Sequence, residues 1–489
     1  MKMNPESYTE SLLSENKKAE GIYYTPKETC QAILNRYVEL SNDSKVLEPG
    51  CGCGHFARLL FQSFESQGIS PETILAENLK LVEKDSDAVK ILSNDFGVDS
   101  KSITNNSFLQ NLNLEKDLFD YIIGNPPYAA KLSTEDKAYC LKHYNDIIVP
   151  SKRMDISGYF LRKSIDLLKP GGRLVFVLPA TLLRVNSYKG LRKFILQTCY
   201  VREIIDLRRA FDDVGYETVV LVLDKKGSGV KSRPVKTLTE IKGLGIDEYE
   251  TNQCRYGFFK ERPIFSIFAK RIDEHILKKC ETGVQLNDFA TMPRGFSISA
   301  KDESLLDEQI NGYIPIIFGR DMGKYRLHHP RKFIAWPNDS LNKTHQRHQQ
   351  PKILVQNLAY RVVATDDDEG HLISETINTL FVDENRFHRH YILGIINSNL
   401  MTYYFQMAVT NRAKLNIHMD HPYLGKLPIK ETTPESQNKV VGWVKELLKD
   451  TNNRVVREKL EAEVFRIYGL DEDEQKRVLS WPIFGRRNR

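Results

Sequence analysis

The chain has 489 residues, of which 41% are hydrophobic and 27% charged, and its formal net charge is +6. This length predicts two or three domains, and the composition is that of a globular protein rather than a disordered or fibrous one. No stretch approaches the roughly 18 consecutive apolar residues of a membrane helix, and the N-terminus lacks the apolar core of a secretory signal. We therefore expect a cytoplasmic protein that does not associate with membranes.

The cysteines and the charges are unevenly distributed. The seven cysteines are irregularly spaced, which argues against a disulfide framework. Cys51 and Cys53 have no second pair nearby, so we interpret them as small residues of a tight turn rather than metal ligands. Residues 1–230 contain 30 basic and 30 acidic residues, so the whole positive surplus follows residue 230. This asymmetry indicates a C-terminal domain that faces a polyanion.

From the N-terminus onward, the chain begins with a polar segment, residues 1–20, which we expect to form a short helical arm. Short apolar strands then alternate with amphipathic helices. The strands are expected at residues 45–50, 79–85, 119–125, 173–180, 203–207 and 218–225, and the helices at 55–64, 86–96, 159–168 and 188–199. This alternation predicts an α/β domain with a parallel sheet covered on both faces.

The pattern changes after residues 225–236, which mix glycine, serine, proline and lysine and are interpreted as a linker. Residues 237–430 contain short mixed segments in which aromatic and basic residues intermingle. Residues 434–470 have helical spacing with alternating charges, which predicts two helices. We therefore divide the chain into an arm (1–20), an α/β catalytic domain (21–230) and an α+β domain (231–489) that ends in a helical tail.

The segment VLEPGCGCGHF places a strand before a glycine-rich turn and a helix. Gly50, Gly52 and Gly54 allow the backbone to approach a ligand closely, and the helix N-terminus offers free N–H groups. The spacing differs from the G-x-G-x-x-G turn of dinucleotide-binding enzymes. Glu83, at the carboxyl end of the next strand, can accept both hydroxyls of a ribose, and Glu48 would face a cationic group. The pattern indicates a nucleoside-containing cofactor that needs no pyrophosphate cradle.

The segment IIGNPPYAA places Asn125 and two prolines directly after an apolar strand. Two successive prolines remove two backbone donors and stiffen the loop. The loop therefore leaves carbonyl groups uncommitted and points its side chains in fixed directions. Such an arrangement suits the binding of a group that is rich in hydrogen-bond donors.

The segments GIYYTP, LEPGCGCG, VEKD and GNPPY, in this order, resemble the gamma-class (Taq-type) DNA adenine-N6 methyltransferases of restriction-modification systems. The resemblance covers about residues 20–225 and continues more diffusely into the C-terminal half. It implies a Rossmann-like methyltransferase sheet that uses S-adenosylmethionine and no metal. It also implies a C-terminal target-recognition domain that binds double-stranded DNA.

The resemblance also implies roles for the loop at residue 125. The exocyclic amine of adenine is a poor nucleophile because its lone pair is delocalised into the ring. The side-chain oxygen of Asn125 and the carbonyl of Pro126 would accept its two N–H groups, and the rigid loop would position the nitrogen for in-line transfer. Because the target lies inside a duplex, the base must be flipped out. Tyr128 and Phe211 would then replace its lost stacking.

The resemblance also implies which residues form the cofactor pocket. Thr25 resembles the residue that contacts the cofactor's carboxylate. Glu48 and Gly50 resemble pocket residues, and Glu83 resembles the ribose ligand.

The aromatic positions carry over as well, with one departure. Phe108 and Phe160 resemble the aromatics that enclose the cofactor's adenine. The family usually has an acid before the first of them, in contact with the cofactor's amino group, whereas this chain has Ser107. A hydroxyl can still accept a hydrogen bond there, although more weakly.

In residues 292–361, arginine, lysine and histidine alternate with aromatic residues and glycine. This mixture suits contacts with the phosphates and base edges of a nucleic acid. RGFSIS, PIIFGRDM, INSNL and GKLPI resemble the specificity domains of the same enzymes. We expect DNA to lie in a cleft between the two domains. The residues expected to face it are Arg294, Arg320, Lys324 and Arg326.

Two alternatives share the chemistry of the NPPY loop, a protein glutamine-N5 methyltransferase and an RNA adenine methyltransferase. A third alternative is a non-catalytic DNA-binding subunit. The basic C-terminal domain and the YTP element favour DNA as the substrate. Cytosine-N4 enzymes more often have serine in place of Asn125, so adenine is favoured. We expect a monomer that modifies without cleaving, with any restriction endonuclease for the same site encoded separately.

Overall fold

The computed structural model describes residues 25–110, 112–128, 130–150, 153–207, 217–335, 348–357, 360–413, 419 and 421–482. The expected arm at residues 1–20 and Phe211 lie outside these ranges. The chain forms two compact units, Met1–Lys270 and Arg271–Arg489. Within the described residues, no helix has the length and apolar character needed to cross a membrane. All seven cysteines are buried and unbridged.

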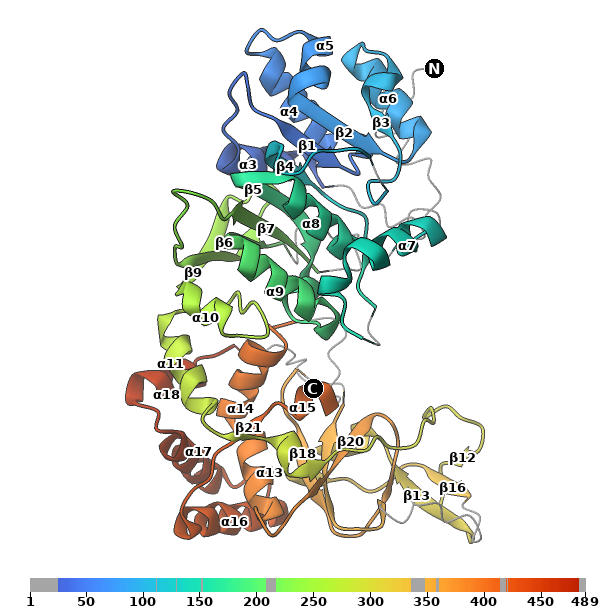
Figure 1. Ribbon diagram of the computed structural model, residues 1–489. Coiled ribbons are helices and arrows are strands. Elements are labelled where there is room, and N and C mark those ends of the chain that lie inside the picture. The colour runs from blue at the N-terminus through green and yellow to red at the C-terminus, as the bar shows by residue number, and fades with distance from the viewer. Residues whose placement is uncertain are drawn as a thin grey trace. The chain divides into compact units, whose positions relative to one another are not determined.

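The N-terminal unit follows the alternation of strands and helices that the sequence predicts, and α6 and β7 have the predicted bounds (Figure 1). Its strands are β1 (Val46–Pro49), β2 (Leu79–Glu83), β3 (Thr104–Asn105), β4 (Phe119–Gly124), β5 (Leu168–Pro179), β6 (Cys199–Asp206), β7 (Thr218–Lys225), β8 (Val235–Lys242) and β9 (Glu248–Cys254). Its helices include α3 (Lys27–Tyr37), α4 (His55–Glu65), α5 (Pro71–Thr73), α6 (Ser86–Phe96), α7 (Thr134–His143), α8 (Ile156–Leu167), α9 (Lys189–Thr198) and α10 (Tyr256–Lys260).

These strands form one nine-stranded sheet in the order β3-β2-β1-β4-β5-β7-β6-β8-β9. The strands from β3 to β5 are parallel to one another, and β7 runs antiparallel to both β5 and β6. Helices connect β1 to β2, β2 to β3 and β4 to β5, as is usual between parallel strands. The predicted Rossmann-like sheet is therefore confirmed, with a larger antiparallel share than the sequence suggested.

Both faces of the sheet are buried. Val175 and Val177 of β5 pack into a cluster with residues of α3, α4 and α6 on one face. Successive side chains of a strand point to opposite faces, and Leu174 and Phe176, which alternate with these valines, are also buried. Figure 1 shows α8 and α9 side by side over the strands β5, β7 and β6. β5 begins at Leu168, before the strand start expected at residue 173, so residues 169–172 (KPGG) also belong to the strand.

The boundary between the units falls after Lys270, beyond the linker at 225–236 where the sequence placed it. The physical reason is that β8 pairs in parallel with β6, and β9 pairs with β8. The residues after the linker therefore extend the N-terminal sheet. Val235 and Leu238 are fully buried there, which ties β8 to the core of this unit.

The C-terminal unit combines small sheets with a group of helices. Its strands are β10 (Val284–Gln285), β11 (Ala290–Thr291), β12 (Leu305–Leu306), β13 (Tyr313–Ile317), β14 (Met322–Gly323), β15 (Arg326–Leu327), β16 (Phe333–Ala335), β17 (Lys352–Gln356), β18 (Ala364–Asp367), β19 (Leu372–Ile373), β20 (Ile377–Val382) and β21 (Pro428–Ile429). Its helices include α11 (Arg271–Cys280), α13 (Arg389–Asn397), α14 (Asn399–Tyr404), α15 (His421–Leu424), α16 (Pro434–Lys449), α17 (Arg454–Tyr468) and α18 (Glu472–Leu479).

The strand part of this unit consists of two four-stranded sheets, β11-β20-β17-β18 and β12-β16-β13-β19, and two two-stranded sheets, β10-β21 and β14-β15. The helix α13 packs against α16, and α16 packs against α17. The structure thus contains both predicted C-terminal helices, and it adds α18, which the sequence pattern did not reveal. The expected α+β architecture of the C-terminal half agrees with this arrangement.

Two glycines with similar backbone conformations provide a test of how tightly the first unit is packed. Gly54 and Gly97 have φ angles of 79° and 66°, but a Cβ atom would lie 2.3 Å from Leu92 at Gly54 and near nothing at Gly97. Gly97→Ala should cost about 1 kcal/mol of stability for the left-handed conformation. Gly54→Ala should cost about 1–3 kcal/mol more because the buried leucine must move. Thermal unfolding of the two variants measures the difference, and equal midpoints would contradict it.

Candidate functional site

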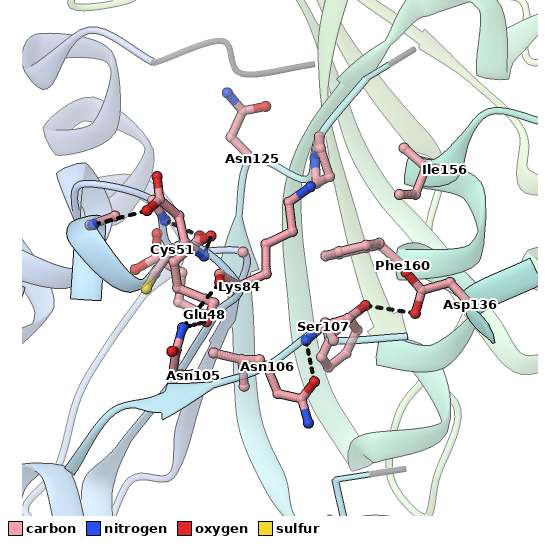
Figure 2. Close-up of a pocket in the computed structure, with 18 of the residues that line it drawn as sticks. Glu48, Cys51, Lys84, Asn105, Asn106, Ser107, Asn125, Asp136, Ile156 and Phe160 are labelled. Atoms are coloured by element: carbon pink, nitrogen blue, oxygen red, sulfur yellow. Dashed lines mark hydrogen bonds between the residues drawn. The ribbon is translucent and has the colours of Figure 1, made fainter. Parts of the chain in front are cut away.

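A cavity of about 870 Å³ lies within the N-terminal unit, where β1, β2 and β4 end (Figure 2). A volume of this size suits a ligand as large as a nucleoside derivative. The structure brings together at this cavity most of the site residues predicted from the sequence. The predicted residues that line it are Thr25, Glu48, Gly50, Glu83, Ser107, Phe108, Asn125 and Phe160.

The glycine-rich turn between β1 and α4 is attached to the neighbouring strand β2. The N–H group of Gly50 donates to the carbonyl oxygen of Val82 at 2.8 Å, and the N–H group of Gly52 donates to Glu83 Oε2 at 2.7 Å. A Cβ atom at Gly50 would lie 3.4 Å from the Phe160 ring. Glycine at this position therefore lets the turn approach the aromatic wall of the cavity.

Glu83 is fixed by the backbone on both of its oxygens. Oε2 accepts from Gly52, and Oε1 accepts from the N–H group of Asp85 at 2.9 Å. Burial raises the pKa of the Glu83 carboxyl, and the two backbone donors oppose this shift. Each carboxylate oxygen can accept more than one hydrogen bond, so a fixed Glu83 can still accept two ligand hydroxyls. This geometry suits the expected ribose contact.

Two buried polar groups of the cavity lack partners among the described residues. Thr25 Oγ1 and Glu48 Oε2 are inaccessible to solvent and make no hydrogen bond there. Burial raises the pKa of the Glu48 carboxyl well above its ordinary value, and the negative charge of Glu83 raises it further. Buried polar atoms are normally paired. A hydroxyl and a carboxyl oxygen without partners in one cavity therefore indicate a polar ligand that supplies their hydrogen bonds.

The aromatic wall consists of Phe108 and Phe160, whose ring centroids are 5.1 Å apart at an interplanar angle of 47°. Lys163 holds this wall in place. Its ammonium donates to the carbonyl oxygens of Phe108 and Gln110, both at 2.6 Å, and lies 4.8 Å from the centre of the Phe108 ring. Burial lowers the pKa of the Lys163 ammonium to about 8. Sequence reasoning missed Lys163, although its position three residues after Phe160, on the same face of α8, is a usable signal.

The NPPY loop enters the cavity through Asn125 and Pro127, whereas Pro126 and Tyr128 are not part of the lining. The ring of Tyr128 is buried, with only 1% of the residue exposed. Its hydroxyl donates a hydrogen bond to Asn125 Oδ1. Tyr128 therefore orients the amide of Asn125 in this structure, and its ring is covered rather than presented to the cavity.

The residues expected to face DNA belong to the second unit and differ in their surroundings. Arg294, Arg320 and Arg326 are exposed. Lys324 is half-buried, and its ammonium donates to the carbonyl oxygen of Asn397. Burial lowers the pKa of this ammonium, and the charge of Glu461 opposes the shift. Lys324 therefore uses its charge inside the unit, which leaves the three arginines as candidates for phosphate contacts.

Both regions of the chain match known families. Residues 33–212 match the Eco57I restriction-modification methylase family, and residues 314–429 match the TaqI-like C-terminal specificity domain. The first range includes Glu48, Glu83 and Asn125. The second runs from β13 to β21.

Individual relatives agree with these matches. The modification methylase CviBIII of Paramecium bursaria Chlorella virus NC1A is 28% identical over 238 residues, which cover 46% of this chain and 58% of the viral protein. The type II methyltransferase M.VspI of Vibrio sp. (strain 343) is 25% identical over 321 residues, covering 64% of this chain and 74% of that protein. The chain thus spans less than two thirds of the viral relative.

The fold is also known from solved structures. The type IIL restriction-modification enzyme MmeI, solved in complex with DNA, superposes with a TM-score of 0.66 at 12% identity. The match covers 98% of this chain and 81% of that chain. At this identity the similarity establishes the fold.

The burial of the Glu48 carboxyl has a consequence for stability. Its pKa is raised in the folded protein, so folding favours the protonated acid and the ionised form is destabilising at neutral pH. Glu48→Gln should therefore raise the midpoint of thermal unfolding at pH 7.5. The gain should shrink as the pH falls and vanish below the ordinary pKa near 4.5, where the glutamate is protonated in both states. A midpoint that is lower than that of the wild type at pH 7.5 would contradict this assignment.

Proposed function

Since the chain joins a region of the Eco57I restriction-modification methylase family to a TaqI-like specificity domain, we propose that it is a site-specific DNA methyltransferase that modifies N6 of adenine. S-adenosylmethionine is the proposed methyl donor, and double-stranded DNA is the proposed substrate. The observation that carries the proposal is a shared cavity. Asn125, the proposed acceptor of the substrate amine, lines the same cavity as Glu83 and the aromatic wall.

The residues present fit S-adenosylmethionine. Glu83 has both oxygens fixed and can accept the ribose hydroxyls. Phe108 and Phe160 offer apolar faces to an adenine ring. The unpaired Thr25 hydroxyl can donate to the carboxylate of the cofactor, and the unpaired oxygen of Glu48 suits a positively charged amino group. When bound, this cofactor supplies a methyl group that is already activated on a sulfonium.

The NPPY loop then activates the substrate nitrogen. Asn125 Oδ1 and the Pro126 carbonyl accept the two N–H groups of the adenine amine, which directs the nitrogen lone pair away from the ring. The oxygen of an amide has two lone pairs, so Asn125 can keep its bond from Tyr128 while it accepts the substrate. A loop stiffened by two prolines keeps these acceptors in place, and such positioning accounts for a large part of the rate in transfer reactions.

Base flipping requires aromatic surfaces for the extruded adenine. Tyr128 is one proposed surface, and since its ring is covered in the structure, we infer that the loop rearranges when the base enters. Phe211 is the second proposed surface, and it lies outside the described residues.

Asn125→Ala should abolish methyl transfer because the substrate amine loses an acceptor. Binding of S-adenosylhomocysteine should stay within about threefold, because the cofactor contacts proposed here come from other residues. The measurement is transfer of labelled methyl groups to long unmethylated DNA, followed by single-molecule sequencing that locates the modified adenines. The matched control is Asn94→Ala, an exposed asparagine of α6, which should transfer normally. Normal transfer by Asn125→Ala, or label in protein or RNA rather than DNA, would contradict the proposal.

Arg326 and Lys324 should differ in DNA binding by the full-length chain. The affinity of a protein that neutralises phosphates falls with salt, and each lost phosphate contact lowers the slope of log K against log salt by about 1. Arg326→Ala should show this loss because its side chain is exposed. Lys324→Gln should keep the wild-type slope, since its ammonium is engaged by Asn397. Fluorescence anisotropy at several salt concentrations measures both slopes, and the reverse order would contradict the assignment.

A further inference from the structure

The cavity contains a carboxylate that the sequence pattern did not identify. Ser107 Oγ donates a hydrogen bond to Asp136 Oδ1 at 2.9 Å, and both residues line the cavity. Figure 2 shows the two side chains meeting beside the Phe160 ring. Asp136 belongs to α7, and the loop that carries Ser107 follows β3. Two segments that are distant in the sequence thus build one polar corner at the edge of the aromatic wall.

The polar corner is held in a defined geometry. The N–H group of Leu109 donates to Ser107 Oγ at 3.3 Å, so the serine hydroxyl hydrogen is available for Asp136. The N–H group of Asp136 donates to Ser133 Oγ at 3.0 Å, which caps the start of α7. Asp136 is 8% exposed. Its second oxygen, Oδ2, accepts no hydrogen bond from the part of the chain that the structure describes.

The surrounding charges do not neutralise this carboxylate through a direct contact. Lys163 is a cation that interacts electrostatically with Asp136. Its ammonium is bonded instead to the carbonyl oxygens of Phe108 and Gln110, and it forms no ion pair with Asp136 among the described residues. Asp136 is thus a mostly buried carboxylate with a free oxygen, and it lies beside the aromatic wall. Such a carboxylate can accept a hydrogen bond from a donor on the edge of a planar ring that packs against this wall.

We propose that Asp136, oriented by Ser107, binds the exocyclic amino group of the adenine in S-adenosylmethionine and thereby selects an adenine nucleoside as the cofactor. This inference rests on the proposed function, because it concerns the same cavity. It explains how the chain can lack an acid at residue 107. The serine acts as a positioning residue, and the acid is supplied by α7.

The test compares two ligands that differ at the group in question. S-adenosylhomocysteine has the 6-amino group, whereas S-inosylhomocysteine has an oxygen there, which a carboxylate repels. Isothermal titration calorimetry of the full chain should show that Asp136→Asn weakens S-adenosylhomocysteine binding by about tenfold, the size of one hydrogen bond to a charged group. The affinity for S-inosylhomocysteine should stay the same or improve, because the asparagine amide can donate to the oxygen.

Two further variants separate this role from a structural one. Lys137→Gln removes a neighbouring exposed charge of α7 that does not line the cavity, and it should leave both affinities within about twofold. Ser107→Ala keeps the carboxylate but removes the bond that orients it, so it should show a smaller loss with the same ligand selectivity. This variant also tests the inference if Asp136→Asn does not fold, which thermal unfolding would reveal.

The outcomes are distinct. A selective loss of S-adenosylhomocysteine binding supports the assignment of Asp136. Equal losses for both ligands, or unchanged affinities in both the Asp136 and Ser107 variants, would overturn this inference and leave the proposed function intact. A wild-type protein that binds neither ligand would overturn the proposed function and this inference together.

Discussion

The parallel register of β1 with β2 and β4 is the constraint on which the site depends. Pro49 lies opposite Val82, so β1 and β2 end at the same edge of the sheet. The ends of the three strands deliver Glu48, Glu83 and Asn125 to one cavity. A shift of one residue would turn each side chain to the opposite face. Backbone pairing between the strands therefore positions these three polar side chains, and the apolar core that fixes the register keeps them in place.

The same apolar core also compensates for the free energy that is lost by burying the Glu48 carboxyl. Burying Glu48 with one unpaired oxygen works against folding, as its raised pKa shows. Most residues of the strands around it are buried, among them Leu47, Leu81 and Ile122, and this burial outweighs the local cost. A ligand that pairs with the oxygen recovers the lost interaction. Part of the affinity of the cavity thus originates in the destabilisation of its empty form.

The sequence was sufficient for local features and insufficient for contacts between distant segments. The bounds of α6 and β7 follow from hydrophobic periodicity and from the capping residues Asp85 and Gly97. The glycine-rich turn and the NPPY loop stand out because their residue types are unusual for their positions. Asp136 did not stand out, since its role depends on Ser107, a residue 29 positions away. Lys324 looked like a surface cation because the sequence does not show that Asn397 lies beside it.

The placement of β8 and β9 in the first unit has a consequence for protein engineering. Recognition domains are attractive parts to exchange between enzymes, and the glycine-rich segment after β7 looks like a natural junction. A graft at that point would separate β8 from the N-terminal unit. β6 would lose its pairing with β8, and the core would lose the buried side chains of Val235 and Leu238. The exposed edge strand would then be open to aggregation. A junction after Lys270 keeps the sheet whole, so chimeras should be built there.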